Sequence, residues 1–166
     1  MLFEWIRTTI ILPGNVLIII PAILLYFTGY RFVPNNIVLL VIGGVLLIAG
    51  LGLAVWTMLL FATKGRGTAA PWNPPKKLVV VGPYCHVRNP MITSVLTIQI
   101  AEVLLLNSWW IFFLFLLFFA GNMIYFPMFE EKDLEKRFGQ SYLDYKRNVP
   151  RWLPRLTAWT MKDQEK

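Results

Sequence analysis

Long apolar runs separated by short polar segments dominate this chain. The runs cover residues 9–27, 37–61, 91–106 and 109–126, and only residues 107–108 separate the last two. Each run approaches the roughly 20 residues that a helix needs to cross the hydrocarbon core of a bilayer. The pattern therefore predicts an all-α integral membrane protein with about four transmembrane helices, of which the last two form a tight antiparallel hairpin.

Two polar segments, a central loop at 64–90 and a C-terminal tail at 130–166, flank the last two runs. The central loop contains a short β-like stretch at 78–81, and it is long for a connection; long ordered loops usually carry function. In the tail, apolar residues recur at helical spacing and Gly139 interrupts the pattern, which predicts two short helices lying against the membrane surface. These apolar residues are Leu134, Phe138, Tyr142, Tyr145 and Val149.

The composition and the charge agree with a membrane protein. Hydrophobic residues make up 57% of the chain, above the roughly 45–50% of soluble domains. The net charge is +7, but no block of Lys and Arg or helix-turn-helix pattern points to nucleic acid. Of the 16 basic residues, 14 lie in the central loop or the tail. With four spans, the positive-inside rule places both segments and both termini in the cytoplasm.

The single cysteine, Cys85, excludes an internal disulfide and a multi-cysteine metal site. The single histidine, His86, makes a zinc or haem site improbable. We therefore expect no metal and no nucleic acid among the partners, and the apolar runs make the lipid bilayer one partner. A lipophilic or lipid-modified small molecule is the further partner that the resemblance described below implies.

Motifs in the second half of the chain carry a resemblance to a known family. They run from Gly67 to Pro71, then through Pro74-Pro75-Lys76-Lys77, Gly82-Pro83-Tyr84, Val87-Arg88-Asn89-Pro90-Met91, Glu130-Glu131, Phe138-Gly139 and Val149-Pro150-Arg151-Trp152-Leu153-Pro154. In this order and spacing the chain resembles the isoprenylcysteine carboxyl methyltransferase and phospholipid methyltransferase superfamily. The resemblance implies an integral-membrane methyltransferase that uses S-adenosylmethionine without a Rossmann domain.

The resemblance also implies which residues form the site. The positions that match the family's cofactor motifs are Arg88, Asn89, Pro90, Glu130 and Glu131. Asn89 stands where the family often has His, so a role that needs an imidazole proton is lost. Ile92 stands where the family often has Tyr, and Tyr84 is a candidate for the missing aromatic contact.

These residue types suit the implied chemistry. The planar guanidinium of Arg88 fits the cofactor's carboxylate, and Glu130 or Glu131 fits its ammonium or ribose hydroxyls. Pro90 begins the third span and leaves backbone N–H groups free toward the loop. We expect Arg151 and Glu131 to be the catalytic residues, with Arg151 neutralising an acidic acceptor.

Two other functions remain open from the sequence. A membrane sterol-type reductase that uses NADPH resembles this superfamily around the same loop and final helices. A non-enzymatic four-span transporter would use Glu102, an ionisable residue within the third run, as its coupling carboxylate. The sequence leaves open whether Glu102 is functional, and whether the acceptor is an isoprenylcysteine-like carboxylate or a lipid head group.

Overall fold

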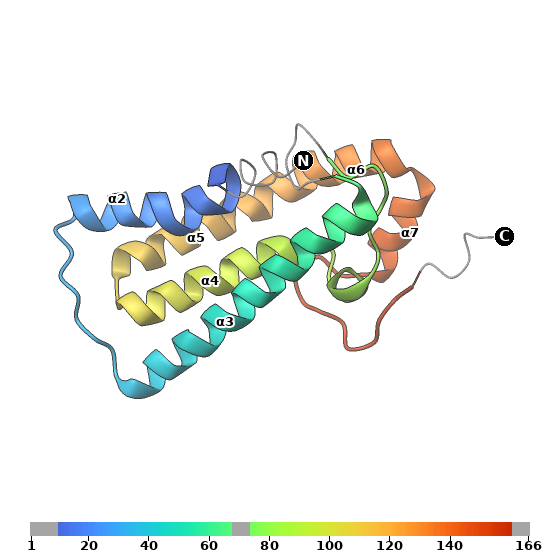
Figure 1. Cartoon of the computed structure of the whole chain (residues 1–166). Coiled ribbons are helices and arrows are strands. Elements are labelled where there is room, and N and C mark those ends of the chain that lie inside the picture. Colours follow the sequence, from blue (N-terminus) through green and yellow to red (C-terminus); the bar gives the residue numbers. More distant parts are fainter. Residues whose placement is uncertain (1–9, 68–73, 161–166) are drawn as a thin grey trace.

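The structure, a computed structural model, describes residues 10–67 and 74–160 (Figure 1). Within these ranges every regular element is helical, as the sequence predicts, and the β-like stretch at 78–81 pairs with no strand. The elements are η1 (Ile10–Ile19), α2 (Ile20–Phe27), α3 (Ile37–Leu60), η2 (Phe61–Gly65), η3 (Gly82–Cys85), α4 (Pro90–Leu106), α5 (Trp109–Tyr125), η4 (Phe126–Glu130), α6 (Glu131–Phe138) and α7 (Gln140–Asn148).

Helices α3 and α4 form the most closely packed pair of the bundle. A Cβ atom on Gly43 would lie 2.9 Å from Leu105, and one on Gly50 would lie 2.7 Å from Ile98. These glycines therefore let the two helices approach each other closely. Gly44 and Gly52 lie on the same helix, but a Cβ at either position would meet open space. Only one face of α3 makes the close contact.

Helices α4 and α5 form the predicted antiparallel hairpin. Asn107 ends α4 in the left-handed conformation, with φ at 48°, which turns the chain directly into α5. The end of the hairpin is tied to the connection between α2 and α3, because the hydroxyl of Tyr30 donates to the carbonyl of Leu106. Asn107 Nδ2 also donates to the carbonyl of Val33 at 3.4 Å.

Two helical stretches of the described chain, Ile37–Gly65 and Trp109–Phe138, are long and apolar enough to cross a membrane. Pro13–Phe27 and Pro90–Leu106 are shorter apolar helices. A helix of 30 residues is about 45 Å long, whereas the hydrocarbon core is about 30 Å thick. The charged last turns of Trp109–Phe138 therefore extend beyond the core.

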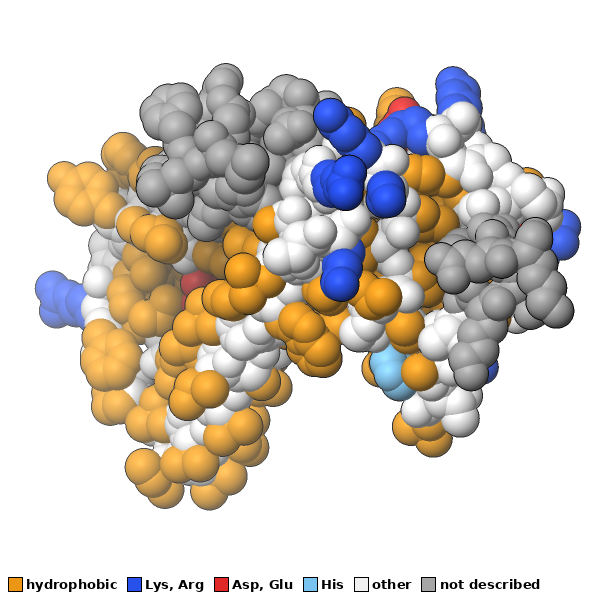
Figure 2. All heavy atoms as spheres, turned by 45° about the vertical axis from the view of Figure 1, so that its right-hand side comes forward, with side chains coloured by type: hydrophobic (Ala, Val, Ile, Leu, Met, Phe, Trp, Pro, Cys, Tyr) orange, Lys and Arg blue, Asp and Glu red, His pale blue; other side chains and the backbone are white. Residues whose placement is uncertain are grey.

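Apolar side chains cover the outside of the bundle. Ile48 on α3 is 74% exposed and Leu117 on α5 is 73% exposed, as expected of side chains that face lipid. In Figure 2 hydrophobic side chains cover the lower left of the molecule, while most of the visible Lys and Arg gather over the other end. The bundle thus has an apolar body and one strongly basic end.

The basic end is a small polar layer built from the central loop and the tail. The tail forms two short helices, α6 and α7, which meet at Gly139 with φ at 53°, as the sequence predicts. Their apolar face packs against the central loop rather than lying open toward the membrane surface. The residues of this small core are Leu78, Val80, Leu134, Phe138, Tyr142, Tyr145, Val149 and Trp159.

Candidate functional site

The central loop and the tail meet, as the sequence leads us to expect, through hydrogen bonds to the loop backbone. The buried hydroxyl of Tyr145 donates to the carbonyl of Tyr84 at 2.7 Å. Residues 149–160, which follow α7 and which we call the strap, run along the loop. The backbone N–H groups of Arg155 and Trp159 donate to the carbonyls of His86 and Cys85, each at 3.0 Å.

A third backbone bond joins the strap to the loop beside the expected site. The N–H of Arg88 donates to the carbonyl of Pro150 at 2.8 Å. Along the loop, Cys85, His86 and Arg88 bond in turn to Trp159, Arg155 and Pro150 of the strap. The residue numbers of the strap fall as those of the loop rise, so the two segments run antiparallel. The local backbone of the loop at 84–88 therefore depends on the tail.

Glu131 is the centre of a buried ion-pair cluster. Only 1% of the residue is exposed, and its Oε1 accepts from Arg88 Nη1 at 2.9 Å and from Arg151 Nε at 2.6 Å. Lys146 Nζ lies 3.1 Å from Oε2 of Glu131 and 2.6 Å from Oε1 of Glu135. Three cations thus surround one carboxylate, which joins the loop, α6, α7 and the strap.

The charge of this cluster controls the ionisation of Glu131. Burial raises the pKa of its carboxyl group, but the hydrogen bond from Arg151 and the charge of Arg88 lower the pKa more. The pKa of Glu131 consequently lies below the ordinary value of 4.5. Glu131 is an ionised partner for Arg88 and Arg151 at neutral pH.

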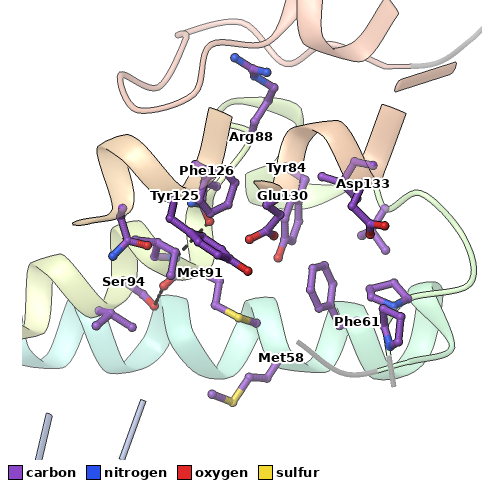
Figure 3. A pocket seen from close by; sticks show the side chains of 18 of the residues that line it. Met58, Phe61, Tyr84, Arg88, Met91, Ser94, Tyr125, Phe126, Glu130 and Asp133 are labelled. Carbon is purple, nitrogen blue, oxygen red and sulfur yellow. Dashed lines mark hydrogen bonds between the residues drawn. The ribbon is translucent and has the colours of Figure 1, made fainter. Parts of the chain in front are cut away.

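Glu130 lies in a different environment, on the wall of a cavity of about 770 Å³. The size is in the range of small-molecule sites. Burial raises the pKa of Glu130 to about 7, with Asp133 and Glu131 adding to the shift and Arg137 opposing it. No hydrogen bond or ion pair holds its carboxylate within the part of the chain that the structure describes. Figure 3 shows Glu130 beside Tyr84, with the hydroxyl of Tyr125 turned toward the same space.

The cavity extends from the polar layer into the bundle. Its polar end includes Glu130, Asp133 and Arg137, and its apolar end includes Leu17 of η1 and Phe118 of α5. A molecule with a polar group and an apolar body would therefore find a matching wall at each end.

Several buried hydrogen-bonding atoms near the cavity have no partner among the described residues. They are the hydroxyl of Tyr84, Nε of Arg88 and Nδ2 of Asn89, and all three residues line the cavity. Asn89 uses its Oδ1 to accept from the N–H of Ile92 at 3.3 Å, which caps α4 and leaves the amide nitrogen unused. Because buried polar groups are normally hydrogen-bonded, this set of donors indicates a ligand that accepts hydrogen bonds.

The structure separates the residues predicted from the sequence into two groups. Tyr84, Arg88, Asn89 and Glu130 line the cavity, but the guanidinium of Arg88 points away from Glu130 and toward the tail (Figure 3). The described lining does not include Pro90, Glu131 or Arg151. Pro90 is the buried first residue of α4. The predicted contacts of these three with cofactor or acceptor stay predictions.

Other lining residues were not predicted from the sequence as part of the site. Phe61 stacks on Tyr84 with ring centroids 5.3 Å apart, and Asn122 and Tyr125 come from α5. Phe61 and Tyr125 belong to apolar runs that contain many other aromatic residues, whereas Asn122 is a polar residue within such a run and could have been singled out. Ile92 also lines the cavity, so the position at which the family often has Tyr faces the site.

Taken together, these features define a helical membrane protein with a small-molecule site between its bundle and a polar layer. Comparison with known proteins agrees with this class: a family model described as phospholipid methyltransferase matches residues 38–141, more than half of the chain. The chain belongs to the phospholipid methyltransferase family. Comparisons with curated proteins and with solved structures found no significant match.

Membership of this family confirms the resemblance found in the sequence and indicates a membrane methyltransferase. It favours methyl transfer over the sterol-type reductase and the transporter. Within the described ranges, no group of three His, Cys, Asp or Glu is placed to hold a metal ion; that the protein needs no metal stays a prediction.

Proposed function

We propose that the protein transfers a methyl group from S-adenosylmethionine to a lipophilic acceptor at the cytosolic face of the membrane. The observation that carries this proposal is the cavity lined by Glu130, which has no partner among the described residues, together with the unused donors of Tyr84, Arg88 and Asn89 beside it. The carboxylate of the cofactor would accept hydrogen bonds from these donors. Its positively charged amine and sulfur would face the carboxylate of Glu130. The residues present therefore fit it.

Asn89, Arg88 and Tyr84 would hold the hydrogen-bond acceptors of the cofactor. Asn89 Nδ2 is a buried donor of a residue on the cavity wall, without a partner among the described residues, and it suits a carboxylate. The guanidinium of Arg88 points toward the tail (Figure 3), so Arg88 would have to turn its Nε toward the same group. Glu130 would hold the positively charged end, close to the rings of Tyr84 and Phe61. S-adenosylmethionine would supply a sulfonium-bound methyl group, which the acceptor's nucleophile would attack in line as the bond to sulfur breaks and S-adenosylhomocysteine leaves. Such chemistry depends mainly on alignment, which can contribute about 7–11 kcal/mol.

The acceptor would come from the bilayer. The cavity wall includes Val16, Leu17 and Phe118 from helices of the apolar body, which supports an acceptor with a lipid-like part. An isoprenylcysteine-like carboxylate and a lipid head group both have this character. Either would place its polar, reactive end beside the polar layer.

Glu131 and Arg151 would act from outside the cavity. Glu131 binds the guanidinium groups of both Arg88 and Arg151, so it would fix the position of Arg88 at the cofactor. Arg151 keeps part of its side chain exposed, at 24%, and would neutralise an acidic acceptor that approaches the layer. The ion-pair cluster then orients the site instead of contacting the methyl group.

We also propose four membrane spans with both termini in the cytoplasm. The two long helical stretches and the two shorter apolar helices support this number, and the basic end of the molecule supports the orientation. Reporter fusions at residues 35 and 108 should both report the outer face. A cytoplasmic report from either fusion would contradict the four-span topology.

The test is calorimetric titration of the detergent-purified protein with S-adenosylhomocysteine, the product form of the cofactor. The variant Asn89→Asp keeps an oxygen that caps α4 but replaces the Nδ2 donor by a carboxylate oxygen. Loss of a charge-assisted hydrogen bond costs about 1.5–3 kcal/mol, so we expect Asn89→Asp to weaken binding by roughly 10-fold to 100-fold.

Asn148→Asp is the matched control, because Asn148 is exposed on α7 and does not line the cavity. It should bind like the unmodified protein. No binding to the folded, unmodified protein would refute the proposed function. Binding that Asn89→Asp leaves unchanged would instead refute the proposed location of the carboxylate.

A further inference from the structure

The strap carries two leucines that are almost completely exposed. Leu153 is 82% exposed and Leu156 is 99% exposed. A single exposed leucine is common on protein surfaces. These two, however, lie on an irregular segment three residues apart, and the small core of the polar layer takes up other residues of the tail and strap, such as Val149 and Trp159.

Trp152 connects this part of the strap to the apolar body. Its ring centroid lies 6.2 Å from that of Phe119 and 6.0 Å from that of Phe126. Both phenylalanines belong to Trp109–Phe138, a helical stretch able to cross a membrane. Tryptophan is enriched where a membrane meets water. Leu153 directly follows Trp152, so its backbone lies where the apolar body meets the polar layer.

The charge of the strap matches the same boundary. Its two charged residues, Arg151 and Arg155, are both basic. Arg155 is held along the strap by donating to the carbonyl of Asn148 at 2.7 Å and to the hydroxyl of Thr157 at 3.2 Å. Apolar side chains flanked by arginines suit a bilayer surface that contains anionic lipids.

We propose that the strap is a membrane-contacting element, in which Leu153 and Leu156 insert into the interfacial region of the bilayer beside the end of α5. The proposal concerns a surface that the site does not use. It also links the bilayer to the site, because the same strap bonds to the backbone of Cys85, His86 and Arg88. Contact with lipid would hold the strap, and the strap holds the loop.

The experiment places an environment-sensitive bimane label on a cysteine introduced by Leu156→Cys, in the full chain with Cys85→Ser. The protein is reconstituted in nanodiscs of phosphatidylcholine and phosphatidylglycerol. Doxyl-labelled lipid quenches a label in the bilayer, and iodide quenches a label in water. Ile48→Cys, 74% exposed on α3, marks the lipid phase, and Arg147→Cys, with 74% of its side chain exposed on α7, marks the aqueous phase.

We expect the label at 156 to be quenched by doxyl lipid and to be shielded from iodide relative to the label at 147. A label introduced by Leu153→Cys should behave in the same way, which guards against a fault specific to one variant. Quenching at both positions by iodide alone would overturn the proposal. Shielding from both quenchers would also overturn it, and cross-linking would then show whether a second copy covers the strap.

Discussion

Glu130 and Glu131 are neighbours in the sequence but belong to two different regions of the molecule. Glu131 is surrounded by three cations and joins four segments, whereas Glu130 faces the cavity without a partner in the described chain. Successive residues on a helix point about 100° apart, so one helix end serves both regions. The carboxylate of Glu131 therefore stabilises the fold, whereas the carboxylate of Glu130 is available to a ligand.

The largest expected effect is on stability, at Glu131. Glu131→Gln removes the charge that faces Arg88 and Arg151, and breaking a buried ion pair costs about 3–5 kcal/mol. We expect a loss of this size in the free energy of unfolding, measured by denaturation in mixed micelles. Asp144→Asn is the control: the pair of Asp144 with Arg147 at 3.9 Å is exposed, so its loss should cost less than about 1 kcal/mol. Equal losses of unfolding free energy in Glu131→Gln and Asp144→Asn would show that the buried cluster is no more stabilising than an exposed ion pair.

The next effect is on binding, at Glu130. Glu130→Gln keeps the shape of the side chain but removes the charge that would face the cofactor's ammonium. We expect affinity for S-adenosylhomocysteine to fall roughly 10-fold to 100-fold, which corresponds to about 1.5–3 kcal/mol. The unfolding free energy should not fall, because Glu130 has no ion pair to lose within the described chain. A stability loss equal to that of Glu131→Gln would contradict the comparison.

The pH dependence sharpens the same prediction. The pKa of Glu130 is raised from 4.5 to about 7, so its carboxylate becomes protonated as the pH falls through neutrality. Affinity for S-adenosylhomocysteine, whose ammonium would face Glu130, should therefore fall between about pH 8 and pH 5.5, and Glu130→Gln should abolish that dependence. A dependence that persists in the variant would show that another group titrates.

The contributions of the two residues to stability should depend on pH in opposite directions. The folded protein holds the proton of Glu130 more tightly than the unfolded chain does, so the stability contribution of Glu130 is present below about pH 4.5 and is lost as the pH rises through 7. The pKa of Glu131 is lowered, so its contribution is present above pH 4.5 and is lost as the pH falls below this value. Unfolding curves of the two Gln variants against pH separate these terms.

The smallest effect concerns the link between the regions, at Tyr145. Tyr145→Phe removes the hydrogen bond to the carbonyl of Tyr84, which should cost about 1 kcal/mol of stability. Because Tyr84 lines the cavity, affinity for S-adenosylhomocysteine should also fall, but by less than in Glu130→Gln. Tyr26→Phe, at a residue 81% exposed on α2, should change neither quantity. Unchanged binding in Tyr145→Phe would show that the cavity tolerates movement of the loop.

The sequence predicts the helices well because length and apolar character decide them. The predicted runs at 37–61, 91–106 and 109–126 correspond closely to α3, α4 and α5. The break at Gly139 was also predictable, since glycine readily adopts the positive φ found there. By contrast, Gly44 and Gly52 look like Gly43 and Gly50 in the sequence, and only the crossing of α3 over α4 distinguishes them.

The site could be predicted only in part. Motif order indicates that the loop and the tail meet, but it does not say which of Glu130 and Glu131 faces the ligand. That choice depends on Lys146 and Arg151, which reach Glu131 from other segments. Phe61 and Tyr125 were missed because aromatic residues are frequent throughout the apolar runs. Which residues face the ligand is decided by contacts between distant segments, and residue type alone does not reveal those contacts.

The strap also determines when the site can exist during synthesis. The carbonyls of Cys85 and His86 receive their donors from Trp159 and Arg155, which are synthesised after α7. The helices can enter the membrane earlier, because their apolar residues are sufficient for that step. A nascent chain that has passed residue 141, the end of the family match, would thus possess its apolar helices and Glu131 before most of α7 and the strap give the loop its final shape. Ligand binding should therefore begin only after the strap has been synthesised.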